Sequence, residues 1–188
     1  MFSLKKILIL ATAAIASTSP LATRDAGTDL LIKDLLRLDL AIRNITYAAG
    51  NYTGGTATYE PIRESFSQVN LTNRIAYYDA MTIKPQNIAE SNRIIAVVSN
   101  PITPDIDQAV NALIAKKDLI DAAGLSAETA DGLNLISYDH DTLSLVAVAP
   151  KLNVATIPVA AVPVLAIDLD WRRGVAAFGG VPLAPITM

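Results

Sequence analysis

The stretch LIKDLLRLDLAIRNITYAA, residues 31–49, indicates the fold class because its apolar residues return every three or four positions. This interval places apolar side chains on one face of an α-helix and polar side chains on the opposite face. Gly50 follows directly, and residues 51–55 (NYTGG) are typical of a turn. We therefore expect an amphipathic helix that ends at Gly50. Its apolar face consists of Leu31, Leu35, Leu38, Ile42, Ile45 and Ala49.

The same spacing recurs in five further segments, which are separated by helix-breaking residues. Asn100-Pro101 ends one segment, and Thr103-Pro104 then combines an N-cap residue with a proline in the first helical turn. Gly124 is typical of the residue that follows a helix C-terminus. The expected helices lie near residues 58–80, 87–98, 103–123, 126–149 and 162–178. We predict an all-α bundle of five to six antiparallel helices.

The most apolar stretch, residues 145–167 (LVAVAPKLNVATIPVAAVPVLAI), contains one charged side chain. It could span a membrane, lie in the core or line a site for an apolar ligand. Prolines at 150, 158 and 163 would interrupt a spanning helix, because proline has no backbone N–H to donate. We therefore expect no transmembrane span and interpret the stretch as a loop that leads into the last helix. In the last two helices, the first capped by Ser126, the residues expected to point inward are Leu135, Ile136, Leu143, Val146, Val164, Ile167, Trp171, Val175 and Phe178.

The N-terminus has the features of a secretory signal peptide. Lys5 and Lys6 precede a short apolar run, and Ala14-Ile15-Ala16 fits the small-x-small cleavage rule. We expect cleavage after Ala16 and a single helical-bundle domain over residues 17–188, ordered from about 28 to 179. The protein is then secreted.

Three Asn-x-Thr sequons, at Asn44, Asn51 and Asn70, predict a glycoprotein when combined with a signal peptide. Asn44 lies on the polar face of its helix and Asn51 follows in the turn. Asn70 lies beside an apolar stripe. We therefore expect glycans at Asn44 and Asn51 more than at Asn70.

The charge balance and the residue inventory argue against several classes of function. Loss of Lys5 and Lys6 leaves 13 of the 15 basic residues against 18 acidic ones, a net charge near −5. This balance argues against nucleic acids and against anionic headgroups bound by charge. The chain has no cysteine, so packing alone must stabilise it.

The motifs of common enzymes are missing from the sequence. There is no G-x-S-x-G, no H-E-x-x-H and no glycine-rich phosphate loop. The single histidine, His140, lies on the flank of its apolar stripe, where a structural role is the more common one. Acidic pairs such as Asp139 and Asp141 are two residues apart and diverge on a helix, so they are poorly placed to share a proton or a metal. We expect a non-enzymatic protein without cofactor or metal.

Three segments carry a family resemblance: DLLRLDLAIRNITYAAGNYTGG (34–55), NPITPDIDQAVNALIAKKDLIDAAGL (100–125) and APKLNVATIPVAAVPVLAIDLDW (149–171). Together they resemble the fungal hydrophobic surface-binding protein A family, which includes cell-wall galactomannoproteins, also called antigenic mannoproteins. The resemblance covers nearly all of the expected mature chain. Its signatures are diffuse: helical spacing, a Tyr-x-Gly-Gly turn, a Lys-Lys pair and a proline-bearing link.

The resemblance implies a secreted helical bundle that adsorbs to hydrophobic surfaces and, in some members, recruits secreted esterases that degrade polymers. Related mannoproteins hold long-chain fatty acids in an apolar tunnel. Wall-anchored relatives carry a Ser/Thr-rich stalk and a hydrophobic tail for a glycolipid anchor, whereas this chain ends in GGVPLAPITM, so we expect no GPI anchor. We expect a monomer. Two functions stay open: a carrier of long-chain lipids, and a surface-binding or structural wall mannoprotein that encloses no ligand.

An enclosed ligand would be held by the facing apolar stripes of the bundle. Small inward residues such as Ala76 and Ala80 can leave a lipid-sized cavity, and they fit close helix packing equally well. Asn73 interrupts its stripe and either meets a carboxyl headgroup or bonds a neighbouring backbone group. The predicted lining consists of Leu38, Ile42, Phe66, Val69, Asn73, Ala76, Val110, Leu113, Leu143, Val146, Trp171 and Val175.

Overall fold

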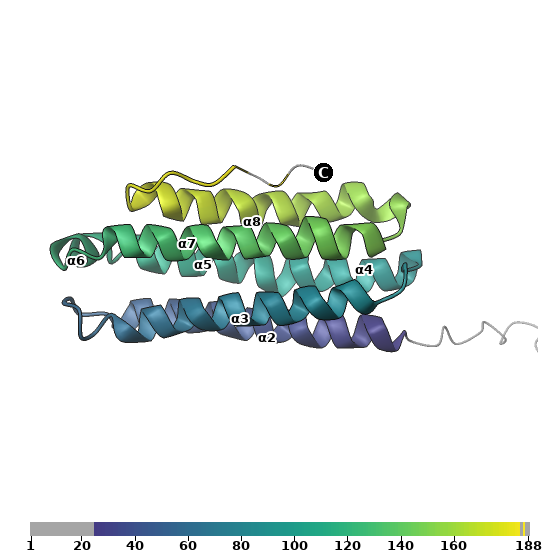
Figure 1. The fold of residues 1–188 in the computed structure, drawn as a ribbon, viewed down its shortest axis with the longest axis horizontal. Coiled ribbons are helices and arrows are strands. Elements are labelled where there is room, and N and C mark those ends of the chain that lie inside the picture. The colour runs from purple at the N-terminus through teal and green to yellow at the C-terminus, as the bar shows by residue number, and fades with distance from the viewer. Residues whose placement is uncertain (1–24, 185, 187–188) are drawn as a thin grey trace, which may run out of the picture.

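The structure, a computed structural model, describes residues 25–184 and 186. These residues form helices and connecting turns, and no strand occurs among them (Figure 1). The predicted all-α bundle is therefore confirmed. The signal peptide predicted at residues 1–16 lies outside the described residues.

The long helices run side by side along the longest axis of the molecule (Figure 1). The α-helices are α2 (Ala26–Asn51), α3 (Glu60–Thr82), α4 (Ile88–Val97), α5 (Thr103–Ile114), α6 (Lys117–Ala122), α7 (Ser126–Asp141) and α8 (Ile157–Ala177). Wider, irregular turns extend α4 and α7, namely η1 (Val98–Ile102) and η2 (Thr142–Val148). Two short turns, η3 (Ala149–Lys151) and η4 (Val154–Thr156), precede α8.

Helix α2 supplies the part of the core that several other helices share. All six residues expected on its apolar face are at most 4% exposed. The helix begins where the Asp25 carboxylate accepts a hydrogen bond from the Thr28 backbone N–H at 3.0 Å, the usual N-cap arrangement. Helices α3, α4 and α5 all pack against α2. Burial of one aliphatic stripe therefore joins four helices.

Two tyrosines hold the turn between α2 and α3 against the opposite helices. The rings of Tyr52 and Tyr59 meet edge to face with centroids 5.8 Å apart. The Tyr59 hydroxyl bonds the Thr129 hydroxyl of α7 at 2.7 Å, and the Lys116 ammonium donates to the Tyr52 carbonyl at 3.0 Å. The turn of the Tyr-x-Gly-Gly segment is thus attached to the far side of the bundle.

The segment expected as one helix near residues 103–123 is divided in two. Helix α5 ends at Ile114, and α6 begins at Lys117 after Lys116 leaves the helical conformation. The Lys116 ammonium bonds the Tyr52 carbonyl, a contact that residue spacing along one helix does not reveal. Gly124 has a positive φ of 71° and closes α6, as expected. Ser126 was expected as an N-cap, but it lies inside α7 and its hydroxyl bonds Asp121 instead.

The last helix begins earlier than the prolines indicated, so the expected loop over residues 157–161 is wrong. Pro158 is the second residue of α8, where a helix needs no N–H from it. Pro163 lies inside the helix and leaves the Val159 carbonyl without its helical donor. Val159 is exposed, so water can serve that carbonyl. Pro163 itself is buried at the pocket wall, and it is compatible with a continuous helix because water can replace the hydrogen bond that it removes.

Two residues expected to point inward are instead exposed: Leu135 at 42% and Val146 at 39%. Leu135 is adjacent to the buried Ile136, and adjacent residues on a helix cannot both face the core centre. In the π-helical turn η2, the wider winding places Leu143 and Ala147 inward and moves Val146 to the surface.

By length and composition, Val154–Ala177 is able to cross a membrane, and 22% of its most apolar window is buried. In the structure α8 packs against α5 and α7. Core helices of soluble proteins share this composition, so the absence of a span stays a prediction.

Two glycines provide a matched test of the packing. A methyl group at Gly132 of α7 would overlap the ring of Phe66 on α3, whereas one at Gly50 of α2 meets nothing within 4 Å. We expect Gly132→Ala to lower the free energy of unfolding by about 1–3 kcal/mol. Gly50→Ala should raise it by roughly 0.5–1 kcal/mol through helix propensity. Urea denaturation of both variants measures this, and equal effects would show that α3 and α7 do not approach so closely.

Candidate functional site

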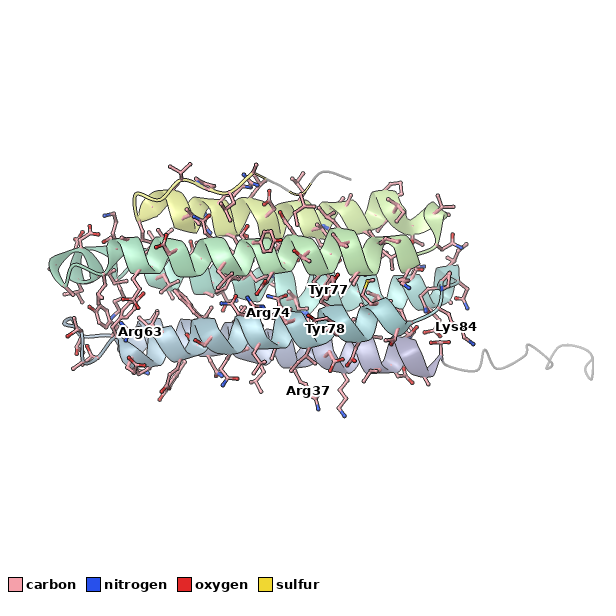
Figure 2. All side chains as sticks on the ribbon, in the orientation of Figure 1. Arg37, Arg63, Arg74, Tyr77, Tyr78 and Lys84 are labelled. Atoms are coloured by element: carbon pink, nitrogen blue, oxygen red, sulfur yellow. The ribbon has the colours of Figure 1, made fainter. Side chains whose placement is uncertain are left out.

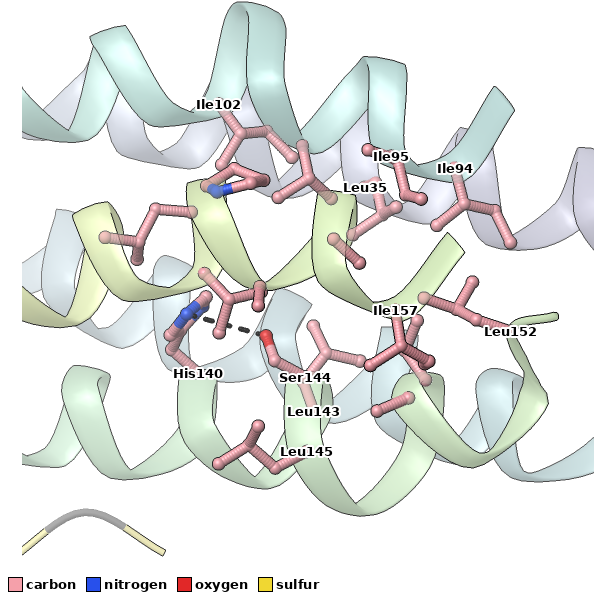
Figure 3. Close-up of a pocket in the computed structure, with 18 of the residues that line it drawn as sticks. Leu35, Ile94, Ile95, Ile102, His140, Leu143, Ser144, Leu145, Leu152 and Ile157 are labelled. Carbon is pink, nitrogen blue, oxygen red and sulfur yellow. Dashed lines mark hydrogen bonds between the residues drawn. The ribbon is translucent and has the colours of Figure 1, made fainter. Parts of the chain in front are cut away.

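The described residues enclose an apolar pocket of about 140 Å³, partly open to solvent (Figure 3). It lies between α8 on one side and α2, α4, η1 and η2 on the other sides. Its lining consists of Leu35, Leu38, Ile94, Ile95, Val98, Ile102, His140, Leu143, Ser144, Leu145, Val148, Ala149, Leu152, Ile157, Ala160, Ala161, Pro163, Val164 and Ile167. All but two of these side chains are apolar.

The pocket exists because α8 presents small residues where a core helix usually presents large ones. Ala160 and Ala161 contribute one methyl group each to the wall. Helix α4 contributes Ile94 and Ile95 to the lining. The two alanines among the larger aliphatic residues of α8 leave a gap that the bundle does not fill.

Two polar side chains, His140 and Ser144, lie on the pocket wall one helical turn apart. The His140 Nε2 and the Ser144 Oγ are 3.5 Å apart (Figure 3). His140 is 6% exposed. Burial lowers the pKa of its imidazole to about 4, although Asp168 and a hydrogen bond to the Val164 backbone both favour the charged form. The ring is therefore neutral near pH 7, with one N–H and one free lone pair.

An ion pair on α8 lies behind the histidine. The Arg172 Nε donates to both carboxylate oxygens of Asp168, at 2.7 and 2.8 Å. Asp141, next to His140 on α7, is buried, and this burial and the negative charge of Asp168 raise the pKa of its carboxyl. No group of three or more His, Asp or Glu residues that could hold a metal occurs within the described part of the chain.

The structure brings two of the twelve predicted lining residues, Leu38 and Leu143, to the pocket wall. Val146 lies on the surface. The other nine predicted residues are buried in the core and do not line the pocket: Ile42, Phe66, Val69, Asn73, Ala76, Val110, Leu113, Trp171 and Val175. Contact between these ten residues and a ligand stays a prediction.

Asn73, which the sequence predicted in the lining, does not lie at the observed pocket. It is buried on α3, away from the pocket wall, and its side-chain oxygen has no hydrogen-bond partner among the described residues. Its predicted headgroup role stays untested. The sequence predicted the helix near residues 87–98 but did not assign α4 to the site, and it missed the first turns of α8 because the prolines concealed a helix there. It treated His140 as structural, and only its neighbours in space show that it faces a pocket.

The sequons fall on different surfaces of the bundle. Asn44 and Asn51 are exposed, on the outer face and at the end of α2, whereas Asn70 is half-buried on α3. The order of glycan occupancy expected from the sequence stays a prediction.

The fold and the pocket define a small helical-bundle protein with an aliphatic site between its helices. The sequence model of the family described as hydrophobic surface binding protein A matches residues 28–149, more than half of the chain. The chain therefore belongs to this family, and the resemblance noted in the sequence is confirmed. A comparison with curated protein sequences finds no match.

Several solved structures share the fold. AFMP4P in complex with palmitic acid has a TM-score of 0.76 and 22% identity, over 80% of this chain and 99% of that chain. Ligand binding domain 1 of the Penicillium marneffei MP1 protein, complexed with arachidonic acids, has a TM-score of 0.73 and 18% identity, over 78% and 94%. Ligand binding domain 2 of the same protein, complexed with multiple arachidonic acids, has a TM-score of 0.76 and 19% identity, over 85% and 99%. At these identities the likeness shows a common fold.

The buried histidine makes a prediction about pH. The folded-state pKa of His140, about 4, lies below the ordinary value of 6.5, so the unfolded chain binds more protons between these values. Stability contributed by the neutral ring is present above pH 6.5 and is lost as the pH falls toward 4. The variant His140→Phe has no imidazole to protonate, so its free energy of unfolding should not show this decrease at low pH. Between pH 7.5 and 4.5 the wild type should lose on the order of 2–3 kcal/mol more than the variant.

Urea denaturation of the two proteins at both pH values measures the difference. Burial and the neighbouring Asp105 raise the pKa of Asp39 to about 6, so Asp39 acts in the opposite direction over the same pH range. Both proteins contain Asp39, so its effect cancels in the comparison. An identical pH dependence in the two proteins would show that the ring is not buried in neutral form.

Proposed function

We propose that the protein is a non-enzymatic lipid-binding protein that encloses the aliphatic chain of a fatty acid or a related molecule. The observation that carries the proposal is the pocket, whose wall is apolar except for His140 and Ser144. Removal of an acyl chain from water yields about 0.8 kcal/mol per CH₂ group before the costs of association. Apolar contact alone can therefore supply useful affinity. Structures of the same fold that contain palmitic or arachidonic acids support this choice of ligand.

The ligand enters by separation of α8 from α4. A cavity near 150 Å³ holds a molecule of about the size of benzene, so a long acyl chain needs more room than the present 140 Å³. Helix α8 contacts α5 and α7 extensively, while its contact with α4 is slight. Its first turns, from Ile157 to Ala161, can therefore move outward at low cost while the Trp171 end stays packed.

The proposed setting is extracellular. The leader that the sequence predicts, with cleavage after Ala16, and the sequons on exposed positions of α2 support a secreted glycoprotein, either released or retained in a cell wall. The chain has no cysteine and can form no disulfide, so the packing of its helices must stabilise it.

Two tryptophan substitutions on α8, one inside the pocket and one outside it, test the carrier function. Ala160 lines the pocket, and Ala176, near the end of the same helix, is exposed and outside it. We expect Ala160→Trp to fill the pocket and weaken palmitic acid binding by about tenfold or more, because an indole occupies the volume of several CH₂ groups. Ala176→Trp should bind as the wild type does. Native mass spectrometry after delipidation measures binding, and circular dichroism controls for helix content. Unimpaired binding by Ala160→Trp would place the ligand elsewhere.

A second candidate function, adsorption to a hydrophobic surface, is favoured by the outer face of α8. Four aliphatic residues spaced three or four apart lie on this face and are each 57–69% exposed. They are Val159, Val162, Leu165 and Leu169. Scattered exposed apolar residues are ordinary, but a continuous stripe along one helix indicates contact with another apolar phase.

A charge-matched pair of double variants tests this face. We expect Val162→Glu with Leu165→Glu to lower adsorption to polystyrene beads several-fold, because two carboxylates would have to leave water. The control, Leu40→Glu with Leu71→Glu, adds the same charge at exposed positions of α2 and α3. Neither pair lines the pocket, so binding of palmitic acid should persist in both. An equal loss of adsorption in the two double variants would mean that net charge, rather than this face, governs adsorption.

A further inference from the structure

The two polar side chains of the pocket lie together in a wall that is otherwise apolar. His140 on α7 and Ser144 on η2 are held by the same stretch of helix, and both face the space beneath α8 (Figure 3). Their ring nitrogen and hydroxyl oxygen are 3.5 Å apart, longer than a well-formed hydrogen bond. Each of the two groups therefore retains capacity for a polar atom of a ligand.

The hydrogen-bonding roles of the imidazole follow from its neutral state. A neutral imidazole has one N–H and one lone pair, and Nε2 is the nitrogen that faces Ser144. In the tautomer with its N–H on Nδ1, the lone pair of Nε2 faces the pocket. This tautomer offers an acceptor, Nε2, beside a hydroxyl that can donate.

An undissociated carboxyl group is complementary to this pair. Its O–H can donate to Nε2 while its carbonyl oxygen accepts from the Ser144 hydroxyl. A carboxylate has no O–H to donate, so it would fit only if Nε2 itself were protonated. In both cases one proton more is present in the complex than in the free carboxylate and the neutral protein.

We propose that His140 and Ser144 form the headgroup site for a fatty acid, and that the ligand binds together with one proton taken from solvent. This inference rests on the proposed function, since it locates the headgroup of the lipid that the pocket encloses. No covalent bond changes. The proton resides between the ligand oxygen and Nε2, and it returns to water on release.

The charged groups around His140 leave the pocket side of the ring free of a counter-ion. On α8, Asp168 is paired with Arg172, and on α7, Asp139 is paired with Arg74 of α3, which lies between α3 and α7 (Figure 2). Asp141 is buried beside the ring, and its carboxyl, like that of Asp139, has a raised pKa. The parts of α2, α4 and η1 that line the pocket contribute aliphatic side chains alone. Among the residues that the structure describes, no lysine or arginine lines the pocket to neutralise a bare carboxylate, so entry of a proton is the remaining way to avoid a buried, unpaired charge.

Calorimetry with two ligands of equal chain length tests the proposal on the intact protein. At pH 6.5, dodecanoic acid should bind with uptake of about one proton, measured as the dependence of the heat on the ionisation enthalpy of the buffer. Its affinity should fall about tenfold per unit of pH above that value, because the free acid stays ionised. Methyl dodecanoate has no proton to gain, and its affinity should not depend on pH.

Variants of the two residues separate headgroup recognition from packing. His140→Phe keeps the ring volume and should weaken dodecanoic acid at least tenfold, with little effect on the methyl ester. Ser144→Ala should weaken the acid about fivefold, while Ser137→Ala, the same change at a buried serine on α7 outside the pocket, should have no effect. Circular dichroism confirms folding, and Ser144→Ala retains the test if His140→Phe does not fold.

Three outcomes would overturn the headgroup site. They are absence of proton uptake, equal weakening of acid and ester by His140→Phe, and equal effects of Ser144→Ala and Ser137→Ala. In each of these outcomes the lipid-binding function itself stands, because both ligands still bind the wild type. Failure of both ligands to bind the wild type would overturn the proposed function instead.

Discussion

Leu31, Leu38 and Ile45 lie in one line along α2, and α3, α4 and α5 all pack against the stripe that these residues define. The chain has no cysteine that could join helices covalently. Removal of this stripe from water is therefore the principal force that holds the first half of the bundle, at about 25 cal/mol for each Å² of apolar surface buried. The Tyr52–Tyr59 pair extends that core to one end, where it fixes the α2–α3 turn against α7. Helices α7 and α8 pack onto this part of the core through their contacts with α3 and α5.

Helix α8 completes the bundle but is packed unevenly along its length. Trp171 and Val175 are buried at its C-terminal half, while the N-terminal half presents alanines to the pocket and aliphatic residues to solvent. A helix that is apolar on two faces and buried on one can contact a ligand inside and an apolar surface outside. The same uneven packing makes its first turns the part of the bundle that opens at least cost, since little contact with α4 has to be broken.

The polar side chains that line the pocket, His140 and Ser144, carry no charge near pH 7. The imidazole of His140 is kept uncharged by burial, and the acids near it are either paired with arginine or have raised pKa values. A buried unpaired ion is costly in such surroundings, so in the proposed complex the headgroup binds together with a proton. In that complex, aliphatic contact would set how tightly a chain is held, and the polar pair would set which end of the ligand lies at η2.

The sequence by itself determined the helical class, the buried stripe of α2, the breaks at Asn100 and Gly124 and the family, because these depend on local spacing and local backbone preference. It did not determine where α8 begins, since tolerance of Pro163 depends on whether the Val159 carbonyl faces water. Nor did it determine the pocket. The wide turn η2 changes the phase of the helix after α7, which moved Val146 outward and left Leu143 and Ser144 facing α8 beside His140. Leu38 and Leu143 were found from their stripes, whereas α4, Ala160 and the polar pair became a site only through the way distant segments pack, which residue spacing within one helix does not encode.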